Sequence, residues 1–316
     1  MTTEIFTQFS AFYNHSLAIL QSALLILICI ILLFSEGRYI ADASFLSVGS
    51  KGMKNQTYDV KKWNQTGFLI LVIWFAVTVV LPFIVLFIQS FKEGTSKFVQ
   101  AFKLLLPTFG SSIGLAFLGA MIIVFVGFAA AFYSARQRGK KENSFDWLLL
   151  IIFAIPSTIF GISLIKFYNQ PMLDLIYSSY LIIIIAYVGK FSFISAKLIG
   201  NAIRQIPKSL EEAAIIQGIS PFKRLISIWI PLIMPSLFIS FMISFIFSLG
   251  ELGTTIMIYP PGTEIMPIKV FTIMANAPQS LTSSMVLIIF SITLLIITSF
   301  FFMMQPFIKK YHYAVD

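Results

Sequence analysis

The chain has 316 residues, of which 58% are hydrophobic and only 11% are charged, and its formal net charge is +9. A soluble domain usually carries about 25% charged residues, so this composition excludes an ordinary water-soluble protein and indicates that lipid surrounds much of the surface. The basic residues are scattered between apolar runs, which is typical of cytoplasmic membrane loops and argues against nucleic acid as a partner.

Seven apolar runs are long enough to cross a bilayer, which takes about 20 helical residues. The first, at about 17–34, contains Cys29, the only cysteine of the chain. It has no basic start and no small-residue cleavage site, so we expect a retained span rather than a signal peptide. The sequence therefore predicts an all-α integral membrane protein. The other spans are expected at about 66–89, 110–134, 147–167, 175–197, 225–249 and 285–305.

The loops predict how these spans are oriented. The loop 135–146 is assigned to the cytoplasm by the positive-inside rule, because it holds Arg136, Arg138, Lys140 and Lys141. Counting the spans alternately places 35–65, 198–224 and the C-terminus inside as well, and the N-terminus outside. The one exception is the loop 90–109, which falls outside although it contains three lysines.

The stretch "SLEEAAIIQGISPFKRLISIWIP", residues 209–231, is a polar interruption between the fifth and sixth spans. Ser209 and Glu212 have the spacing of a capping box, which predicts the start of a short helix. Gly218 can adopt the φ value that ends a helix, and the Ser-Pro pair at 220–221 is typical of the start of another. We therefore expect a helix, a glycine turn and a second helix.

This segment is either a solvated connector or a docking surface. Ala213 and Ala214 are small residues beside an acidic pair, which would let a partner approach the backbone closely. The apolar side chains in the segment are more numerous than a solvated loop needs, and they favour a docking surface on the cytoplasmic side. These apolar residues are Ile215, Ile216, Leu225 and Ile228.

"EAAIIQG", followed by nine residues and "IWIP", resembles the signature loop of ATP-binding-cassette importer permeases. That signature reads Glu-Ala-Ala, three residues, Gly, nine residues, then Ile-x-Leu-Pro, and here Ile230 stands where the pattern prefers leucine. The resemblance implies a coupling helix that docks into a cleft on a cytoplasmic ATPase. The implied coupling residues are Glu211, Glu212, Ala213, Ala214, Gly218 and Pro231, with Ile228 completing the match.

A second stretch, residues 109–140, is similar to an early core span of the same family. Its end matches the family's Ala-Tyr-x-x-Ala-Arg pattern at Ala131, Ala135 and Arg136, with Phe132 in place of the tyrosine. The resemblance thus implies a type I importer permease core of six spans plus one extra N-terminal span.

The implied domains follow from this core. Residues 66–310 would form the six-span permease domain, with the cytoplasmic coupling loop at about 198–224, and 311–316 would be a cytoplasmic tail. Residues 1–65 would be an extra transmembrane helix and a cytoplasmic linker. The extra helix is either the last helix of the first half of a split permease or a simple addition.

The chain contains no Gly-x-x-x-x-Gly-Lys-Ser/Thr sequence to cradle nucleotide phosphates. We therefore expect a transport subunit that is not an enzyme and binds no cofactor, with ATP hydrolysed by a partner. The resemblance implies a bacterial cytoplasmic (inner) membrane protein in contact with lipid. Its implied partners are a dimer of cytoplasmic ATP-binding subunits, a second permease half, identical or a first-half homologue, and an extracytoplasmic solute-binding protein.

Two ionisable residues stand out as candidates for the solute pathway. Lys190 lies inside a span, where a lysine at the bilayer centre costs roughly 2.5–3.5 kcal/mol; it either snorkels, pairs with a carboxylate or faces the pathway. Glu251 either reaches the headgroup region or lies at the outer end of the pathway. The glycines and threonines beside it would allow close helix approach and offer hydroxyl contacts. The candidate pathway residues are Lys190, Gly250, Glu251, Gly253, Thr254 and Thr255.

"GELGTT…YPPGTEIMPIKVF" resembles the permeases that serve ferric iron, with thiamine and aminoethylphosphonate permeases as cousins. Iron is the first choice of cargo, although no His/Cys/Asp/Glu cluster predicts a metal site in this chain. A secondary transporter or channel without an ATPase is the main alternative. A serine protease is disfavoured, because the Gly-x-Ser-x-Gly pattern at 110–114 has no histidine in a core span to serve as base.

Overall fold

The computed structural model describes residues 2–40, 61–136 and 144–312, and the regular structure in these ranges is helical. Most of the predicted basic linker, the loop residues Arg138, Lys140 and Lys141, and the last residues of the tail lie outside the described residues. The helices are α1 (Thr2–Ser10), α2 (His15–Ile40), α3 (Lys61–Phe75), η1 (Ala76–Val80), α4 (Leu81–Phe91), α5 (Thr95–Leu105), η2 (Leu106–Thr108), α6 (Phe109–Arg136), α7 (Ser144–Ala154), α8 (Ser157–Tyr168), α9 (Asp174–Tyr177), α10 (Leu181–Arg204), α11 (Lys208–Ile216), α12 (Pro221–Arg224), η4 (Leu225–Trp229), α13 (Ile230–Gly250), α14 (Thr255–Ile258), α15 (Met266–Met274) and α16 (Gln279–His312).

Several of the described helical segments are long and apolar enough to cross a membrane. A further crossing results if α7 and α8 form one broken span, and the apolar stretch of α2 at Ser16–Ile31 is shorter. The all-helical membrane fold predicted from the sequence is therefore confirmed. The five long segments are Thr66–Phe91, Thr95–Ser134, Leu181–Arg204, Pro221–Gly250 and Gln279–Met303.

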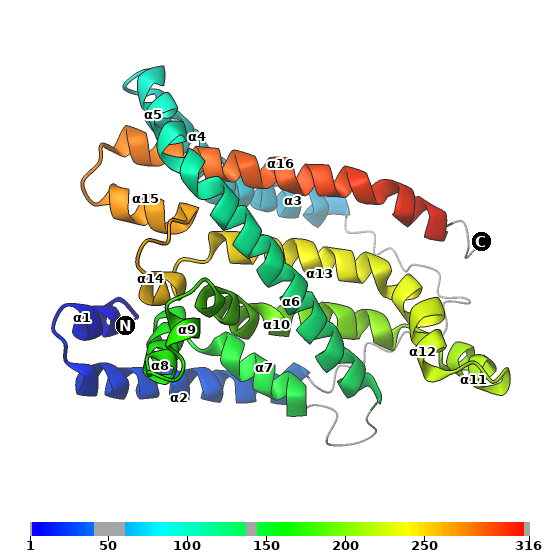
Figure 1. Cartoon of the computed structure of the whole chain (residues 1–316). Coiled ribbons are helices and arrows are strands. Elements are labelled where there is room, and N and C mark those ends of the chain that lie inside the picture. Colours follow the sequence, from blue (N-terminus) through cyan, green and yellow to red (C-terminus); the bar gives the residue numbers. More distant parts are fainter. Residues whose placement is uncertain (1, 41–60, 137–143, 313–316) are drawn as a thin grey trace.

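The centre of the molecule is formed by α6, α10 and α13, which pack on one another (Figure 1). Small residues bring these helices close together, as is usual where helices meet in membranes. Gly127 of α6 lies directly against Ser195 of α10. The hydroxyl of Ser240 on α13 donates a hydrogen bond to Ser195 Oγ at 2.7 Å, and both serines are fully buried.

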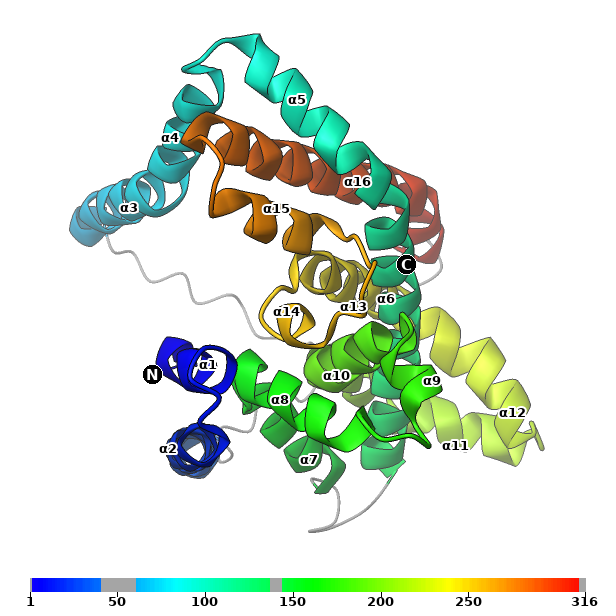
Figure 2. The same cartoon turned by 60° about the vertical axis from the view of Figure 1, so that its left-hand side comes forward.

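Two outer groups of helices flank this centre. On one side α16 packs against α4 and α5, while α3 extends away from the bundle (Figure 2). None of the most apolar window of Thr66–Phe91 is buried. On the other side α1 and α2 pack on α8 through a cluster of Ile5, Ala18, Ile159 and Ile162.

The structure corrects the predicted fourth and fifth spans. The fourth was expected as one helix over 147–167, but α7 and α8 meet at an angle of 104°. Pro156 explains the break, because it has no N–H to continue the hydrogen bonding of α7 and its extended backbone starts α8. The fifth span begins at Leu181 rather than near residue 175, because the short helix α9 occupies the preceding segment.

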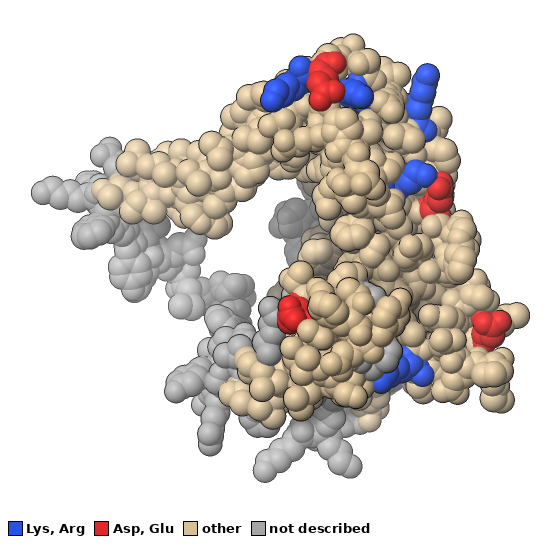
Figure 3. All heavy atoms as spheres, turned by 90° about the vertical axis from the view of Figure 1, so that its left-hand side faces the viewer, with Lys and Arg blue, Asp and Glu red and all other residues tan. Residues whose placement is uncertain are grey.

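The connections lie at two opposite ends of the bundle (Figure 1). One end carries α11 and α12, together with the C-terminal ends of α6, α10 and α16. The other end carries α5, α9, α14 and α15, and Figure 3 looks onto it. Acidic and basic side chains appear there as small separate groups on a mostly uncharged face.

Candidate functional site

The elbow, which we define as residues 208–229, connects α10 to α13. Its first helix, α11, begins at Lys208 because Pro207 takes the N-cap position with extended backbone, at φ −59° and ψ 131°. This start places Ser209 inside the first turn, and no side chain caps the helix. The predicted capping box of Ser209 and Glu212 is therefore wrong, and Glu212 is exposed to solvent.

The predicted glycine turn is confirmed. Gly218 has a φ of +71°, a value that residues with a side chain rarely adopt. Its N–H donates to the carbonyl of Ile215 at 2.9 Å, and the N–H of Ile219 donates to the carbonyl of Ala214 at 3.0 Å. This pair of bonds is a Schellman motif, which satisfies the last carbonyls of α11.

The second helix of the elbow also starts as the sequence predicts. Ser220 is its N-cap and accepts a hydrogen bond from the N–H of Lys223 at 3.4 Å, and Pro221 takes the first position. The helix then widens into a π turn at Leu225–Trp229 before α13 begins. Pro231 explains this turn, because its ring would clash with the carbonyl four residues earlier in a regular α-helix.

The elbow has an exposed tip and a buried base. Ile216 and Phe222 at the tip are 86% and 70% exposed. At the base, Trp229 is buried and its ring meets that of Phe132 on α6 at 5.2 Å between centroids. A partner can reach the backbone at Ala213, which is exposed as expected, whereas Ala214 is buried.

An ion pair joins the two helices of the elbow. Arg224 Nη1 lies 3.7 Å from Glu211 Oε1, and both side chains are largely shielded from solvent. Together with the glycine turn, this pair holds α11 against α12. The elbow is therefore a compact unit whose apolar tip projects from the end of the bundle.

Lys190 is buried on α10 and reaches the break between α7 and α8. Its ammonium group donates to the carbonyl of Phe153 at 3.2 Å and also to the carbonyl of Ile155. In an unbroken helix these carbonyls would accept hydrogen bonds from the next turn. Lys190 thus satisfies backbone groups that the break leaves without helical partners.

Glu251 is buried at the end of α13 and holds the turn that follows. Its carboxylate accepts hydrogen bonds from the N–H of Thr254 at 2.7 Å, from the N–H of Thr255 at 2.9 Å and from the Thr255 hydroxyl at 2.6 Å. The carboxylate is therefore engaged by the backbone and hydroxyl donors of the turn itself. It supports the outer turn, which we define as residues 250–258.

The outer turn packs closely on α8. A Cβ added to Gly253 would lie 2.7 Å from Ser157 Cβ, and one added to Gly161 would lie 2.8 Å from Met257 Cβ. The expectation of close approach is thus confirmed for Gly253. It is wrong for Gly250, where an added Cβ would meet nothing within 4 Å.

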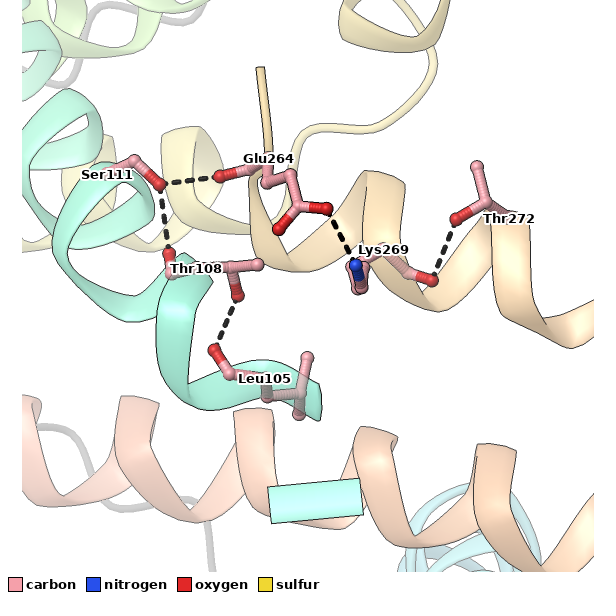
Figure 4. A network of polar contacts seen from close by, with 6 residues as sticks. All are labelled: Leu105, Thr108, Ser111, Glu264, Lys269 and Thr272. Atoms are coloured by element: carbon pink, nitrogen blue, oxygen red, sulfur yellow. Dashed lines mark hydrogen bonds and ion pairs between the residues drawn. The ribbon is translucent and has the colours of Figure 1, made fainter. Parts of the chain in front are cut away.

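A second polar network ties α6 to the chain before α15 (Figure 4). Ser111 Oγ lies 2.5 Å from the carbonyl oxygen of Glu264, and the Glu264 carboxylate pairs with Lys269 at 2.7 Å. Ser112 Oγ accepts a hydrogen bond from the N–H of Met266 at 2.7 Å. The serines of the Gly-x-Ser-x-Gly pattern therefore have structural partners. Among the described residues no group of three or more His, Cys, Asp or Glu side chains is arranged to hold a metal.

The family model for the binding-protein-dependent transport system inner membrane component matches residues 123–312, which is more than half of the chain. The chain belongs to this family. The matched range of the permease contains the elbow, Lys190 and the outer turn. The resemblance seen in the Glu-Ala-Ala loop is therefore confirmed.

Individual relatives agree with this assignment. A protein described as a 2-aminoethylphosphonate transport system permease of Salmonella paratyphi A is 28% identical over 189 residues, covering 59% of this chain and 70% of the relative. An Fe(3+)-transport system permease of Haemophilus influenzae is 24% identical over 300 residues, covering 92% of this chain and 58% of the relative. A bacterial alginate ABC transporter crystallised with its periplasmic protein has a chain of the same fold, with a TM-score of 0.67 at 18% identity, covering 78% of this chain and 96% of that one.

The permease structure brings the predicted pathway residues into two neighbouring groups. Glu251, Gly253, Thr254 and Thr255 lie in the outer turn, and Lys190 holds the helix break just before Ser157, the residue of α8 that Gly253 contacts. Sequence reasoning missed the partners of these residues. The signal for one of them was present, because Pro156 inside an apolar run indicates a break whose carbonyls need donors.

Proposed function

We propose that the elbow of this permease subunit docks on a separate ATP-hydrolysing subunit and transmits its movement to the membrane helices. The observation that carries the proposal is the exposed apolar tip on a buried base. Ile215, Ile216 and Phe222 offer contact area to a cleft, while Trp229 anchors the base against α6. The proposed coupling residues are Glu211, Glu212, Ala213, Ala214, Gly218 and Pro231.

The remaining proposed partners are those that membership of the family implies. The elbow end of the bundle faces the cytoplasm, where the ATP-binding subunits form a dimer and bind the nucleotide, and the C-terminus lies on the same side. The N-terminus and the outer turn face the opposite side, where an extracytoplasmic solute-binding protein delivers the cargo. A second permease half, identical or homologous, completes the pathway.

We further propose ferric iron as the first cargo to test, with 2-aminoethylphosphonate and thiamine as alternatives. The Haemophilus relative, described as a ferric iron permease, matches nearly the whole chain and supports this choice. The relative described as an aminoethylphosphonate permease supports the alternative. Cargo selection belongs to the solute-binding protein. Uptake of each radiolabelled compound by vesicles holding the complete complex tests the assignment, and failure to transport any of the three would contradict it.

The coupling role is tested by two elbow variants in the complete transporter. Glu212→Lys reverses an exposed charge, and Gly218→Pro forces φ to about −65° where the elbow needs +71°. We expect both variants to insert normally, to lose co-purification of the ATPase subunit and to lose uptake.

Matched controls lie at the other end of the bundle. Glu93→Lys reverses an exposed charge there, and Gly94→Pro disturbs a turn where φ is also positive, at +81°. Both controls should retain the ATPase subunit. Normal uptake by Glu212→Lys and Gly218→Pro would refute the coupling role, and uptake by the wild type without any ATPase would favour a secondary transporter or channel.

A further inference from the structure

The helix α7 is an unusual element because it is short, apolar and ends at a break. It packs along α10, and its last carbonyls point out of a helix that does not continue. Unsatisfied backbone groups are costly in a membrane interior, where no water replaces the missing partner. The ammonium group of Lys190 supplies the donor for the carbonyls of Phe153 and Ile155.

The other end of α7 is also held by α10. Asp146, in the first turn of α7, is largely buried and its carboxylate lies 2.8 Å from Lys197 Nζ. Arg204 adds a second cation at 3.9 Å, and the hydroxyl of Ser134 donates to the same carboxylate at 3.4 Å. These contacts join α7 to both α10 and α6.

The two contacts have matching spacing. Lys190 and Lys197 are seven positions apart on α10, which is about two helical turns and places them on one face. Asp146 and Phe153 are also seven positions apart, on a helix that runs antiparallel to α10 (Figure 1). Each cation meets a negative group at its own end of α7: a carboxylate at the N-terminus, and carbonyls where the helix dipole is negative.

We propose that α10 clamps α7 at both ends through Lys190 and Lys197, and that this clamp carries the movement of the elbow to the outer turn. Only three residues separate the end of α10 from the start of α11, so the elbow and α10 are directly connected. At the other end, α8 follows the break and contacts the outer turn through Gly253 and Gly161. Lys190 is a positioning residue in this scheme and does not bind the cargo.

The clamp rests on the proposed coupling function. A positioning role of Lys190 differs from a cargo-binding role in the kinetic parameter that a substitution changes. Loss of a cargo contact raises KM, whereas loss of a positioning contact lowers the maximal rate at constant KM.

The native Cys29 offers a second readout. It lines a small cavity with Ile151, Ala154 and Ile155 at the end of α7, so its reactivity reports on that end without an engineered label.

The test compares Lys190→Met with Lys190→Arg and with Lys166→Met, which removes an exposed lysine on α8. Each variant is reconstituted with its ATPase and binding protein and supplied with whichever of ferric iron or 2-aminoethylphosphonate the wild type accumulates. We expect Lys190→Met to lower the maximal uptake rate by about tenfold at unchanged KM, while the ATPase subunits remain bound. N-ethylmaleimide should modify Cys29 several-fold faster. Lys190→Arg should restore part of the rate, and Lys166→Met should resemble the wild type.

Two outcomes overturn the clamp: a raised KM at normal maximal rate, or unchanged uptake and unchanged Cys29 reactivity in Lys190→Met. Where Lys190→Met fails to reach the membrane, Asp146→Asn provides the same test at the other end, and a normal rate there is equally contradictory. Failure of the clamp is distinguishable from failure of the coupling function. In the first case wild-type uptake still depends on the ATPase, and in the second case it does not.

Discussion

The close contact between α6 and α10 at Gly127 leads to a quantitative prediction for Gly127→Ala. An added Cβ would lie 2.5 Å from Ser195 Cβ and 2.8 Å from the backbone nitrogen of Ala196. Carbon atoms in contact normally stay about 3.5 Å apart, so the helices must separate by about 1 Å. The Ser195 hydroxyl can rotate away, but its Cβ and the backbone of α10 cannot, and the rotation would also break the hydrogen bond with Ser240.

Overpacking of this kind typically costs about 1–3 kcal/mol. We expect Gly127→Ala to lower the Tm of the purified permease by about 5 °C, measured by intrinsic fluorescence in detergent. Gly114→Ala is the matched control, since it adds the same methyl group to the same helix where nothing lies within 4 Å. A Gly127→Ala protein that melts at the temperature of the control would refute the close packing of α6 on α10.

Three further predictions concern the outer turn, the α6–α15 contact and the elbow. Glu251→Gln should destabilise the protein by about 1.5–3 kcal/mol, because a charged acceptor of three hydrogen bonds is replaced by a neutral amide; an unchanged Tm would contradict its structural role. Ser112→Ala should cost about 1 kcal/mol through loss of the acceptor for the Met266 N–H, whereas Ser163→Ala, whose hydroxyl bonds within its own helix, should cost less. Ile216→Asp should leave the Tm unchanged and weaken co-purification of the ATPase subunit more than Gln217→Asp on the same exposed tip; equal binding by both variants would argue against docking at Ile216.

The elbow shows what local sequence can predict. Its glycine turn and the start of its second helix depend on hydrogen bonds between residues at most five positions apart, so Gly218 and the Ser-Pro pair were sufficient to predict them. The start of α11 was mispredicted because two local signals compete there. Pro207 already has the backbone conformation of an N-cap, and this moves Ser209 into the helix.

Lys190 and Glu251 show where local reasoning ends. The cost of placing a lysine inside a span marked Lys190, and its position at the outer end of a span marked Glu251, but neither signal identifies the partners. Glu251 is satisfied by the turn immediately after it, whereas Lys190 is satisfied by carbonyls more than 30 positions earlier in the chain. Identifying the partners of Lys190 required the bend at Pro156 and the packing of α7 on α10.

By itself, the sequence determined that this protein lies in a membrane, approximately where most of its helices cross, and where its polar elbow turns. These properties follow from the transfer of apolar side chains into lipid and from short-range backbone geometry. Both depend only on residues that are close together in the sequence. Only the tertiary structure decided which charges meet, that the fourth span is bent, and that Ala214 faces inward. Contacts between distant helices depend on how their surfaces fit, and small residues such as Gly127 and Gly253 allow that fit without revealing the partner.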